Sequence, residues 1–260
     1  MVDILNRNLA PIPVEAWEFL DEEAREVLEN RLGARKVVDV VGPHGLDKSA
    51  INTGRREDLT GVFKQRKSLS LVEVEIPITM PRAEIEAFAR GAEDADSEPV
   101  REAAEKAAKI ENEAVFQGHA EAGIEGIIPA SEHDAIEIEE DRASFFSAIW
   151  DARRALNLEN VPGPYHLVLG DRLYQLLNEL ESACYPLFKK IEDLLGTEII
   201  YVPELADKGV LLPAGDEYQL HLGQDLSLGY KNSDQEKLEL FLFETFTFQV
   251  NAPEAAVVLE

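Results

Sequence analysis

The chain has 260 residues, of which 51 are acidic and 25 basic, so its formal net charge is −26, and 45% of the residues are apolar. This length allows one large domain or two modest ones, and a single cysteine, Cys184, excludes an intrachain disulfide and a cysteine-rich metal cluster. A balance this acidic also disfavours general nucleic-acid binding, because the overall field repels phosphate backbones.

The hydropathy pattern predicts neither a membrane-spanning protein nor a conventionally secreted one. No stretch approaches 18 uninterrupted apolar residues, and residues 1–28 are charged throughout, without a signal-peptide hydrophobic region. We therefore expect a cytoplasmic location. The acid excess is also typical of proteins from salt-adapted sources, and composition does not separate that interpretation from a functional one.

The first predicted element is an amphipathic helix over residues 13–32, followed by a strand at 37–41 and a turn at Gly42–Gly45. Pro13 lies in the first turn of the helix and Gly33 just beyond its end. Its apolar face contains Val14, Trp17, Leu20, Ala24, Val27, Leu28 and Leu32.

Residues 55–67 form a basic segment in an otherwise acidic chain. The segment holds two acids and five bases, which are Arg55, Arg56, Lys64, Arg66 and Lys67. One interpretation is a solvated hairpin arm; the other is an arm that docks on an acidic surface, such as that of a neighbouring copy. Residues 69–79 then alternate apolar and polar side chains, which predicts a long strand.

The middle of the chain predicts a mixed α+β order. Residues 97–118 form a long helix with an alanine-rich stripe, and residues 132–141, with six acids and no lysine or arginine, form a solvated edge or loop. Further helices are predicted at 143–156, 171–182 and 186–195, separated by the strands YHLVL, EIIYV and GVLLP. The absence of a uniform βαβ repeat disfavours a doubly wound nucleotide-binding fold.

The most strand-like segment is KLELFLFETFTFQV at residues 237–250. Apolar side chains occupy both faces, and Glu244 is the one acid on the face that is otherwise fully apolar. A strand this apolar would promote aggregation at an open edge, so we expect it to be covered by the core or by another subunit.

Catalytic signatures are absent from the sequence. There is no GxxxxGK[ST], GxGxxG, GxSxG, HExxH, CxxC or ExxH motif. The five histidines are scattered, so a Ser/His/Asp grouping in space stays open as an alternative. We predict no enzyme activity and assign no catalytic, cofactor-binding or metal-ligating residue.

Seven segments, in order along nearly the whole chain, resemble the encapsulin family, also known as linocin-type bacteriocin proteins. They are LAPIPVEAWEFLDEEARE, ARKVVDVVGPHG, RKSLSLVEVEIPIT, ENEAVFQGHAEAGIEGI, GPYHLVLGDRLY, LGQDLSLGY and LFLFETFTFQVNAPEAAVVL. The resemblance implies the HK97-type phage capsid fold, an α+β fold with an N-terminal helix, an extended E-loop, a P-domain with a spine helix and an A-domain. The implied boundaries are 1–50 for the N-terminal arm and start of the P-domain, 51–75 for the E-loop, 76–129 for the P-domain, 130–222 for the A-domain and 223–260 for the return to the P-domain.

The resemblance further implies a self-assembling icosahedral nanocompartment of 60 copies or more, about 60 being the smallest number that the symmetry allows. Its subunits would enclose cargo enzymes, such as dye-decolourising peroxidases or ferritin-like proteins, which bind through a C-terminal cargo peptide. Such shells are linked to iron storage and oxidative stress. No nucleic acid or membrane partner is expected. The alternatives are a phage-type major capsid protein and a bacteriocin or protease activity.

Three sets of site residues follow from the resemblance. The E-loop bases named above would contact neighbouring subunits. The five-fold pore loop would contain Ser182, Ala183, Cys184, Tyr185, Pro186 and Leu187, although a plain turn between helices would serve equally well. The cargo-peptide groove would contain Val27, Leu28, Arg35, Asp39, Leu226, Leu228 and Tyr230.

Overall fold

The computed structural model describes residues 4–92, 94–180 and 186–260, which divide into two compact units. The first unit contains the chain up to Leu32 together with Gly42–Ile110 and His221–Thr247. The second contains Gly33–Val41, Glu111–Leu220 and Phe248–Glu260. The chain therefore passes between the units several times, and the domain boundaries implied by the resemblance stay predictions.

The first unit is built on helices whose apolar faces meet. α1 covers Val14–Arg31, as the periodicity at 13–32 predicts, and buries Trp17 and Leu20 because these side chains recur on one face. α2 covers Arg82–Ala89, and α3, the predicted alanine-rich helix, covers Glu98–Phe116. The N-terminal segment adds a short 3-10 turn, η1, at Arg7–Leu9.

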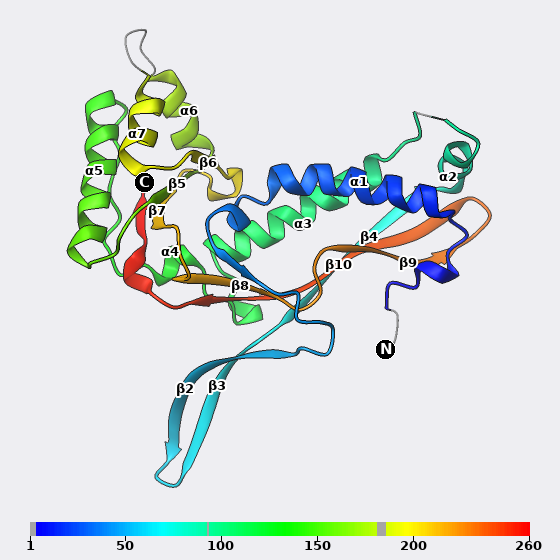
Figure 1. Ribbon diagram of the computed structural model, residues 1–260, viewed down its shortest axis with the longest axis horizontal. Coiled ribbons are helices and arrows are strands. Elements are labelled where there is room, and N and C mark those ends of the chain that lie inside the picture. Colours follow the sequence, from blue (N-terminus) through cyan, green and yellow to red (C-terminus); the bar gives the residue numbers. More distant parts are fainter. Residues whose placement is uncertain (1–3, 93, 181–185) are drawn as a thin grey trace. The chain divides into compact units, whose positions relative to one another are not determined.

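The sheet of the first unit packs against these helices (Figure 1). β10 (Lys237–Val250) lies antiparallel to β4 (Val72–Pro81) on one side and to β9 (Ser227–Ser233) on the other. Leu240 lies opposite Ile78 of β4 and Tyr230 of β9. Side chains on the interior face of this sheet, the alanines of α3 and the apolar face of α1 form one hydrophobic cluster. Because alanine side chains are small, α3 can pack closely against its neighbours in this cluster.

A separate hairpin extends from the first unit. Its strands are β2 (Ala50–Thr60) and β3 (Phe63–Ser70), so the chain from 50 to 70 forms a two-stranded arm and β4 follows directly. The strand predicted at 69–79 is thus displaced, since Leu69 and Ser70 belong to β3 and β4 begins at Val72.

The second unit contains a four-stranded sheet in the order β11-β7-β5-β6, in which β5 is parallel to β6 and antiparallel to β7. These strands are β5 (Tyr165–Leu169), β6 (Ile199–Tyr201), β7 (Gly209–Pro213) and β11 (Val257–Leu259). The helices are α4 (Ile127–Ala130), α5 (Arg142–Leu158), α6 (Asp171–Glu179) and α7 (Leu187–Leu195). Short 3-10 turns are η2 (Ala34–Lys36), η3 (Ala120–Ala122), η4 (Pro203–Leu205) and η5 (Pro253–Ala255).

Two expectations for the second unit need correction. The strand predicted at 37–41 is limited to β1 (Asp39–Val41), because η2 ends at Lys36 and the next two residues, Val37 and Val38, form a turn and a bend. The acidic segment 132–141 is not purely a solvated loop: Ile136 forms a parallel bridge with Leu259, and Ile138 is buried. Asp141, the last acid of this segment, caps α5 by accepting hydrogen bonds from the backbone N–H groups of Ala143 and Ser144.

The strand predicted at 237–250 has those same bounds in the structure and is almost entirely buried. β8 (Tyr218–Leu222) and β10 each continue from one unit into the other. Glu244 is 1% exposed and so lies within the covered part of β10. A fully buried Leu or Phe side chain contributes about 1.5–3 kcal/mol, which makes β10 a principal source of stability for the subunit.

Candidate functional site

The β2–β3 arm is an exposed surface that carries the predicted E-loop bases. The strands pair from Ala50 opposite Ser70 to Thr60 opposite Phe63, and the register shifts between Asn52 and Arg56. Gly54 lies within this irregularity with a φ of +71°, a backbone conformation that glycine adopts without steric cost. From Arg55 to the end of β3, nearly every side chain is exposed.

The charges of the arm are only partly balanced within the arm. Lys64 and Lys67 face Asp58 and Glu57 at 3.4 Å each, and these exposed ion pairs contribute at most about 1 kcal/mol. Arg56 lies directly opposite Arg66. Because like charges opposite each other destabilise a strand pair, an acidic surface placed against the arm would relieve this repulsion.

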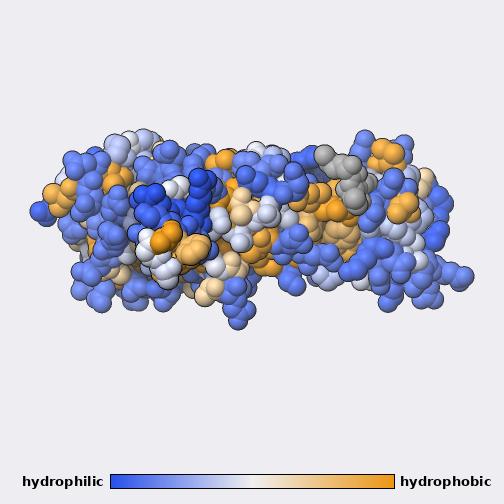
Figure 2. Space-filling view, turned by 90° about the horizontal axis from the view of Figure 1, so that it is seen from below, coloured by the Kyte–Doolittle hydropathy of each residue, from blue (hydrophilic) through white to orange (hydrophobic). Residues whose placement is uncertain are grey.

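The tip of the arm is apolar. Leu59, Val62 and Phe63 are 55%, 89% and 71% exposed. Figure 2 views the molecule from the side to which the arm points and shows a small apolar patch beside strongly hydrophilic side chains. An exposed apolar tip on a charged arm is typical of a surface that contacts another protein.

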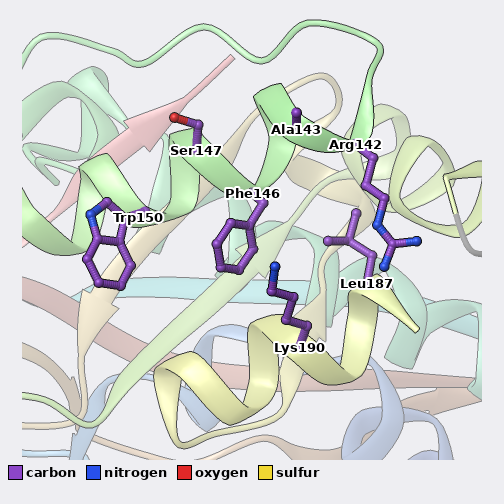
Figure 3. Close-up of a pocket in the computed structure, with 7 residues that line it drawn as sticks. All are labelled: Arg142, Ala143, Phe146, Ser147, Trp150, Leu187 and Lys190. Atoms are coloured by element: carbon purple, nitrogen blue, oxygen red, sulfur yellow. The ribbon is translucent and has the colours of Figure 1, made fainter. Parts of the chain in front are cut away.

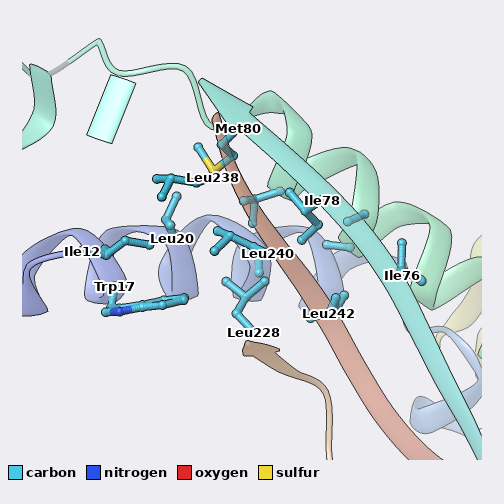
Figure 4. Packing of buried hydrophobic residues seen from close by; sticks show 14 of the residues in the cluster. Ile12, Trp17, Leu20, Ile76, Ile78, Met80, Leu228, Leu238, Leu240 and Leu242 are labelled. Carbon is cyan, nitrogen blue, oxygen red and sulfur yellow. The ribbon is translucent and has the colours of Figure 1, made fainter. Parts of the chain in front are cut away.

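Five of the predicted cargo-groove residues belong to the hydrophobic cluster of the first unit or pack against it. Figure 4 shows one of them, Leu228, among the buried side chains of this cluster. Val27 of α1 and Leu228 of β9 are buried in the hydrophobic cluster, and Leu28, Leu226 and Tyr230 are partly buried against it. These last three therefore lie where the cluster reaches the surface and where an extended peptide could contact it.

The other two predicted groove residues, Arg35 and Asp39, belong to the second unit and have partners there. Arg35 donates to the fully buried carboxylate of Glu111, with 2.9 Å from Nε to Oε1 and 2.6 Å from Nη2 to Oε2. Asp39 accepts a 3.1 Å hydrogen bond from Gln219. Arg35 thus has a structural task, since removing it would leave the Glu111 carboxylate buried without this partner.

The predicted pore loop is described only in part. Ser182, Ala183, Cys184 and Tyr185 lie outside the described residues. Pro186 is exposed at the N-cap of α7, and Leu187 is fully buried in the second unit.

A cavity of about 490 Å³ lies between α5 and α7 (Figure 3). Its aromatic wall is formed by Phe146 and Trp150, and the Lys190 ammonium lies 3.7 Å from the centre of the Phe146 ring. Arg142 and Ser147 add polar groups to the lining. This cation–π contact holds Lys190 near the aromatic wall and gives the cavity a cationic side in an acidic chain.

The described residues contain no group of three or more His, Cys, Asp or Glu side chains that could hold a metal ion. Within those same ranges, no helix is long and apolar enough to cross a membrane.

Sequence reasoning missed Arg7, Asp21 and Glu111. Arg7 donates to both carboxylate oxygens of Asp21, with 2.7 Å from Nη1 to Oδ2 and 2.6 Å from Nη2 to Oδ1. The Arg7 guanidinium also lies 4.6 Å from the centre of the Trp17 ring. Asp21 lies on a predicted helix, but an ion pair to a segment before that helix leaves no periodic signal. Glu111 begins one of the seven resembling segments and follows Ala107 by four positions, so it continues the alanine stripe of the predicted helix, and this spacing was the one available hint.

The α+β fold with its projecting hairpin defines the structural class of this protein, the HK97-type capsid fold. A virus-like particle from Pyrococcus furiosus matches 95% of this chain and 100% of its own, with a TM-score of 0.67 and 16% identity. The capsid protein of the Myoviridae phage XM1 matches 89% of this chain and 90% of its own, with a TM-score of 0.59 and 12% identity. These likenesses confirm the expected fold.

The particular family follows from closer relatives. The family model described as "Encapsulating protein for peroxidase" matches residues 2–247. Type 1 encapsulin shell proteins of Brevibacterium linens and Rhodospirillum rubrum are each 39% identical, over 98% of this chain and over 98% and 95% of their own lengths. The chain belongs to the encapsulin shell protein family. Its relatives are named as shell proteins, which confirms the expectation of a structural protein and not an enzyme.

Proposed function

We propose that this shell protein assembles into a closed icosahedral nanocompartment that encloses cargo enzymes through a C-terminal cargo peptide. The observation that carries the proposal is the exposed β2–β3 arm, with an apolar tip and opposed arginines that a single subunit leaves unbalanced. Family membership supports the shell, and the arm supplies a surface for joining its subunits.

The cargo that the family description favours is a peroxidase, since the matching family model is described as an encapsulating protein for peroxidase. A peroxidase cargo would link the compartment to oxidative stress, and a ferritin-like cargo would link it to iron storage. The loop that begins at Ser182 and ends at Leu187 is the proposed lining of a five-fold pore through which small substrates reach the cargo.

The cargo peptide is proposed to bind where the α1–β9 cluster reaches the surface. Leu28, Leu226 and Tyr230 are partly buried there, which is the exposure expected of apolar anchors that a peptide completes. Arg35 and Asp39 remain proposed polar contacts of the peptide. Because Arg35 also neutralises buried Glu111, substitution of Arg35 tests folding as much as binding.

The test of this groove is Leu28→Asp in shells expressed in the native host. We expect assembled shells that contain at least about fivefold less cargo, because losing one apolar anchor costs on the order of 1–2 kcal/mol. Cargo per subunit is measured by mass spectrometry of shells that electron microscopy shows to be closed.

Val14→Asp is the matched control, since Val14 lies on the same helix and is 68% exposed. Control shells should hold cargo at the parent level. Parent-level cargo in the Leu28→Asp shells would show that the groove lies elsewhere.

A phage-type major capsid protein is the second candidate, because phage capsids share the fold. The two functions differ in contents. A capsid holds nucleic acid, so nuclease-treated particles with a strong nucleic-acid absorbance would favour the capsid, whereas protein cargo without nucleic acid favours the nanocompartment.

A further inference from the structure

The outer face of α5 carries two aromatic side chains where polar ones are expected. The inner face of this helix is buried and consists of Phe145, Ala148, Ile149, Ala152 and Leu156. Phe146 and Trp150 lie outside that face, four positions and so about one turn apart, and Trp150 is 50% exposed. Two large apolar side chains that share an outer helix face and line a cavity mark a candidate binding surface.

The cavity between these aromatics and α7 has an aromatic end and a cationic end. Its volume of about 490 Å³ lies within the range of small-ligand sites, roughly 300–1,000 Å³. Figure 3 shows Phe146 between Trp150 on one side and Arg142 on the other, with Lys190 reaching toward Phe146 from α7. The helix rise of 1.5 Å per residue places Arg142 and Trp150 about 12 Å apart along α5. The lining therefore suits a ligand that is longer than one ring and charged at one end.

Two adjacent lysines of α7 differ in how their charge is balanced. Lys189 pairs with Glu192 at 3.7 Å and with Asp193 at 3.3 Å. Lys190 has no carboxylate of the described ranges within ion-pair distance, and its ammonium lies 3.7 Å from the centre of the Phe146 ring. In a chain with 51 acids and 25 bases, a lysine that faces a cavity without an acid favours an anionic ligand there.

Arg153 orients the indole at the aromatic end. Its guanidinium lies 5.8 Å from the centre of the Trp150 ring, and its Nε is buried without a hydrogen-bond partner among the residues that the structure describes. A guanidinium over an aromatic ring is attracted to the ring electrons and so restricts the indole. A restricted indole loses less conformational entropy when a second aromatic ring stacks on it.

We propose that this cavity binds a planar aromatic monocarboxylate. Lys190 and Arg142 attract the ligand carboxylate, and its rings lie along Phe146 and Trp150. The carboxylate of Asp141, which caps α5 next to Arg142, repels a more highly charged group such as a phosphate ester, so a single negative charge fits best. The 12 Å lining, about 1.5 Å for each helix position, suits two fused rings with a carboxylate. The site lies within the second unit and does not depend on what the shell encloses.

The test uses 2-naphthoate as the probe and 2-naphthamide as its uncharged counterpart. Assembled parent shells are titrated with each compound at about 0.15 M salt, and ligand-observed NMR gives the two dissociation constants. 2-Naphthoate should bind about fivefold more tightly than 2-naphthamide, because only the acid carries the charge that Lys190 and Arg142 attract. Equal affinity for the two compounds, or no saturable binding of 2-naphthoate, would overturn the proposal.

Variants at the two ends of the cavity locate the bound probe. Lys190→Gln and Trp150→Ala should each weaken 2-naphthoate binding about fivefold, and Lys190→Gln should leave 2-naphthamide binding unchanged. Lys190 is exposed, so its variant keeps the fold and decides the test if Trp150→Ala shells do not assemble.

The matched controls are Lys189→Gln for charge and Leu158→Ala for apolar area, since Leu158 is 71% exposed on the same helix as Trp150. Both control shells should bind 2-naphthoate at the parent level. If Lys189→Gln weakens binding as much as Lys190→Gln does, the overall charge attracts the probe and the proposal is wrong.

Solvent access to Trp150 in assembled shells tests whether a neighbouring copy fills the cavity instead. Trp17 is 7% exposed, so Trp150 is the tryptophan that the neutral quencher acrylamide should reach. Parent shells should therefore show quenchable emission that Trp150→Phe shells lack. The same weak quenching in both shells would mean that another subunit covers Trp150, which overturns the proposal and leaves the proposed shell function standing.

Discussion

At the residue scale, two arginines have different tasks although both bind a carboxylate in bidentate fashion. The Glu111 carboxylate that pairs with Arg35 is fully buried, whereas the Asp21 carboxylate that pairs with Arg7 is about one-third exposed. Breaking a buried pair by removing one partner costs about 3–5 kcal/mol, because a charge is left without compensation. Arg35 therefore stabilises the second unit, whereas the partly exposed ion pair of Arg7 contributes less to stability.

Glu23 gives a pH-dependent contact between α1 and the start of α3. Its carboxylate accepts a 2.7 Å hydrogen bond from Ser97 Oγ and a 2.9 Å hydrogen bond from Arg101. The Ser97 hydrogen bond and, secondarily, Arg101 hold the pKa of Glu23 below its ordinary value of 4.5, although partial burial opposes the shift. Because the contacts in the folded state favour the ionised Glu23 carboxylate, this stabilisation is present above pH 4.5 and is lost as pH falls through the lowered pKa.

We predict that Glu23→Gln lowers stability by about 1 kcal/mol at pH 7 and has no effect once the pH is below the lowered pKa. The measurement is the melting temperature of assembled shells from about pH 3 to about pH 7, an interval that contains the ordinary pKa of a glutamate side chain. Glu22→Gln is the control, since Glu22 is an exposed neighbour that pairs with Arg25. A constant difference between Glu23→Gln and parent at every pH would refute the ionic origin of the contact.

At the element scale, the β2–β3 arm and β10 differ in how far their side chains are exposed to solvent. β10 pairs with β4 and β9 along its first part, so both of its edges are hydrogen-bonded there, and its apolar side chains are buried. The arm has only its own two strands and keeps its charged and apolar side chains exposed. An isolated two-stranded ribbon is marginally stable in water, so the arm gains most of its order from whatever it contacts.

We predict that reversing the arm's bases to glutamate impairs assembly most at low ionic strength. The reason is that the arm would then repel the acidic surface of its neighbour instead of attracting it, and salt screens this repulsion. The variant changes Arg55, Arg56, Lys64, Arg66 and Lys67, and the yield of closed shells is measured by sedimentation.

The matched control reverses five exposed bases on helices, so that the net charge changes by the same amount. These are Arg25, Lys106, Lys109, Arg154 and Lys189. Equal loss of assembly in the two variants would show that total charge, and not the arm, is responsible.

At the scale of the whole molecule, a charge of −26 on a 29.0 kDa subunit opposes any assembly of identical copies. Apolar burial at the interfaces must exceed this repulsion, and the repulsion depends on salt. The Debye length falls from about 30 Å at 0.01 M to about 10 Å at 0.1 M, so distant charges on neighbouring subunits become screened within that range.

We therefore predict that the protein concentration at which half the subunits are assembled falls as salt rises from about 0.01 M to about 0.3 M. Light scattering gives this midpoint, and electron microscopy identifies the product as a hollow, megadalton particle. Shells that dissociate as salt is raised would show that attraction between unlike charges dominates the interfaces. A stable monomer at micromolar concentration and moderate salt would contradict assembly itself.

Local sequence patterns by themselves determined α1, α3 and β10, because helical spacing and an unbroken β-prone apolar run are properties of neighbouring residues. The order of seven segments determined the family. Only the tertiary structure placed Arg56 opposite Arg66, gave Arg35 its buried partner Glu111, and brought Arg7 to Leu228, which is 221 positions away. Contacts of that range depend on how the chain closes over the core, and no periodicity within one element encodes them.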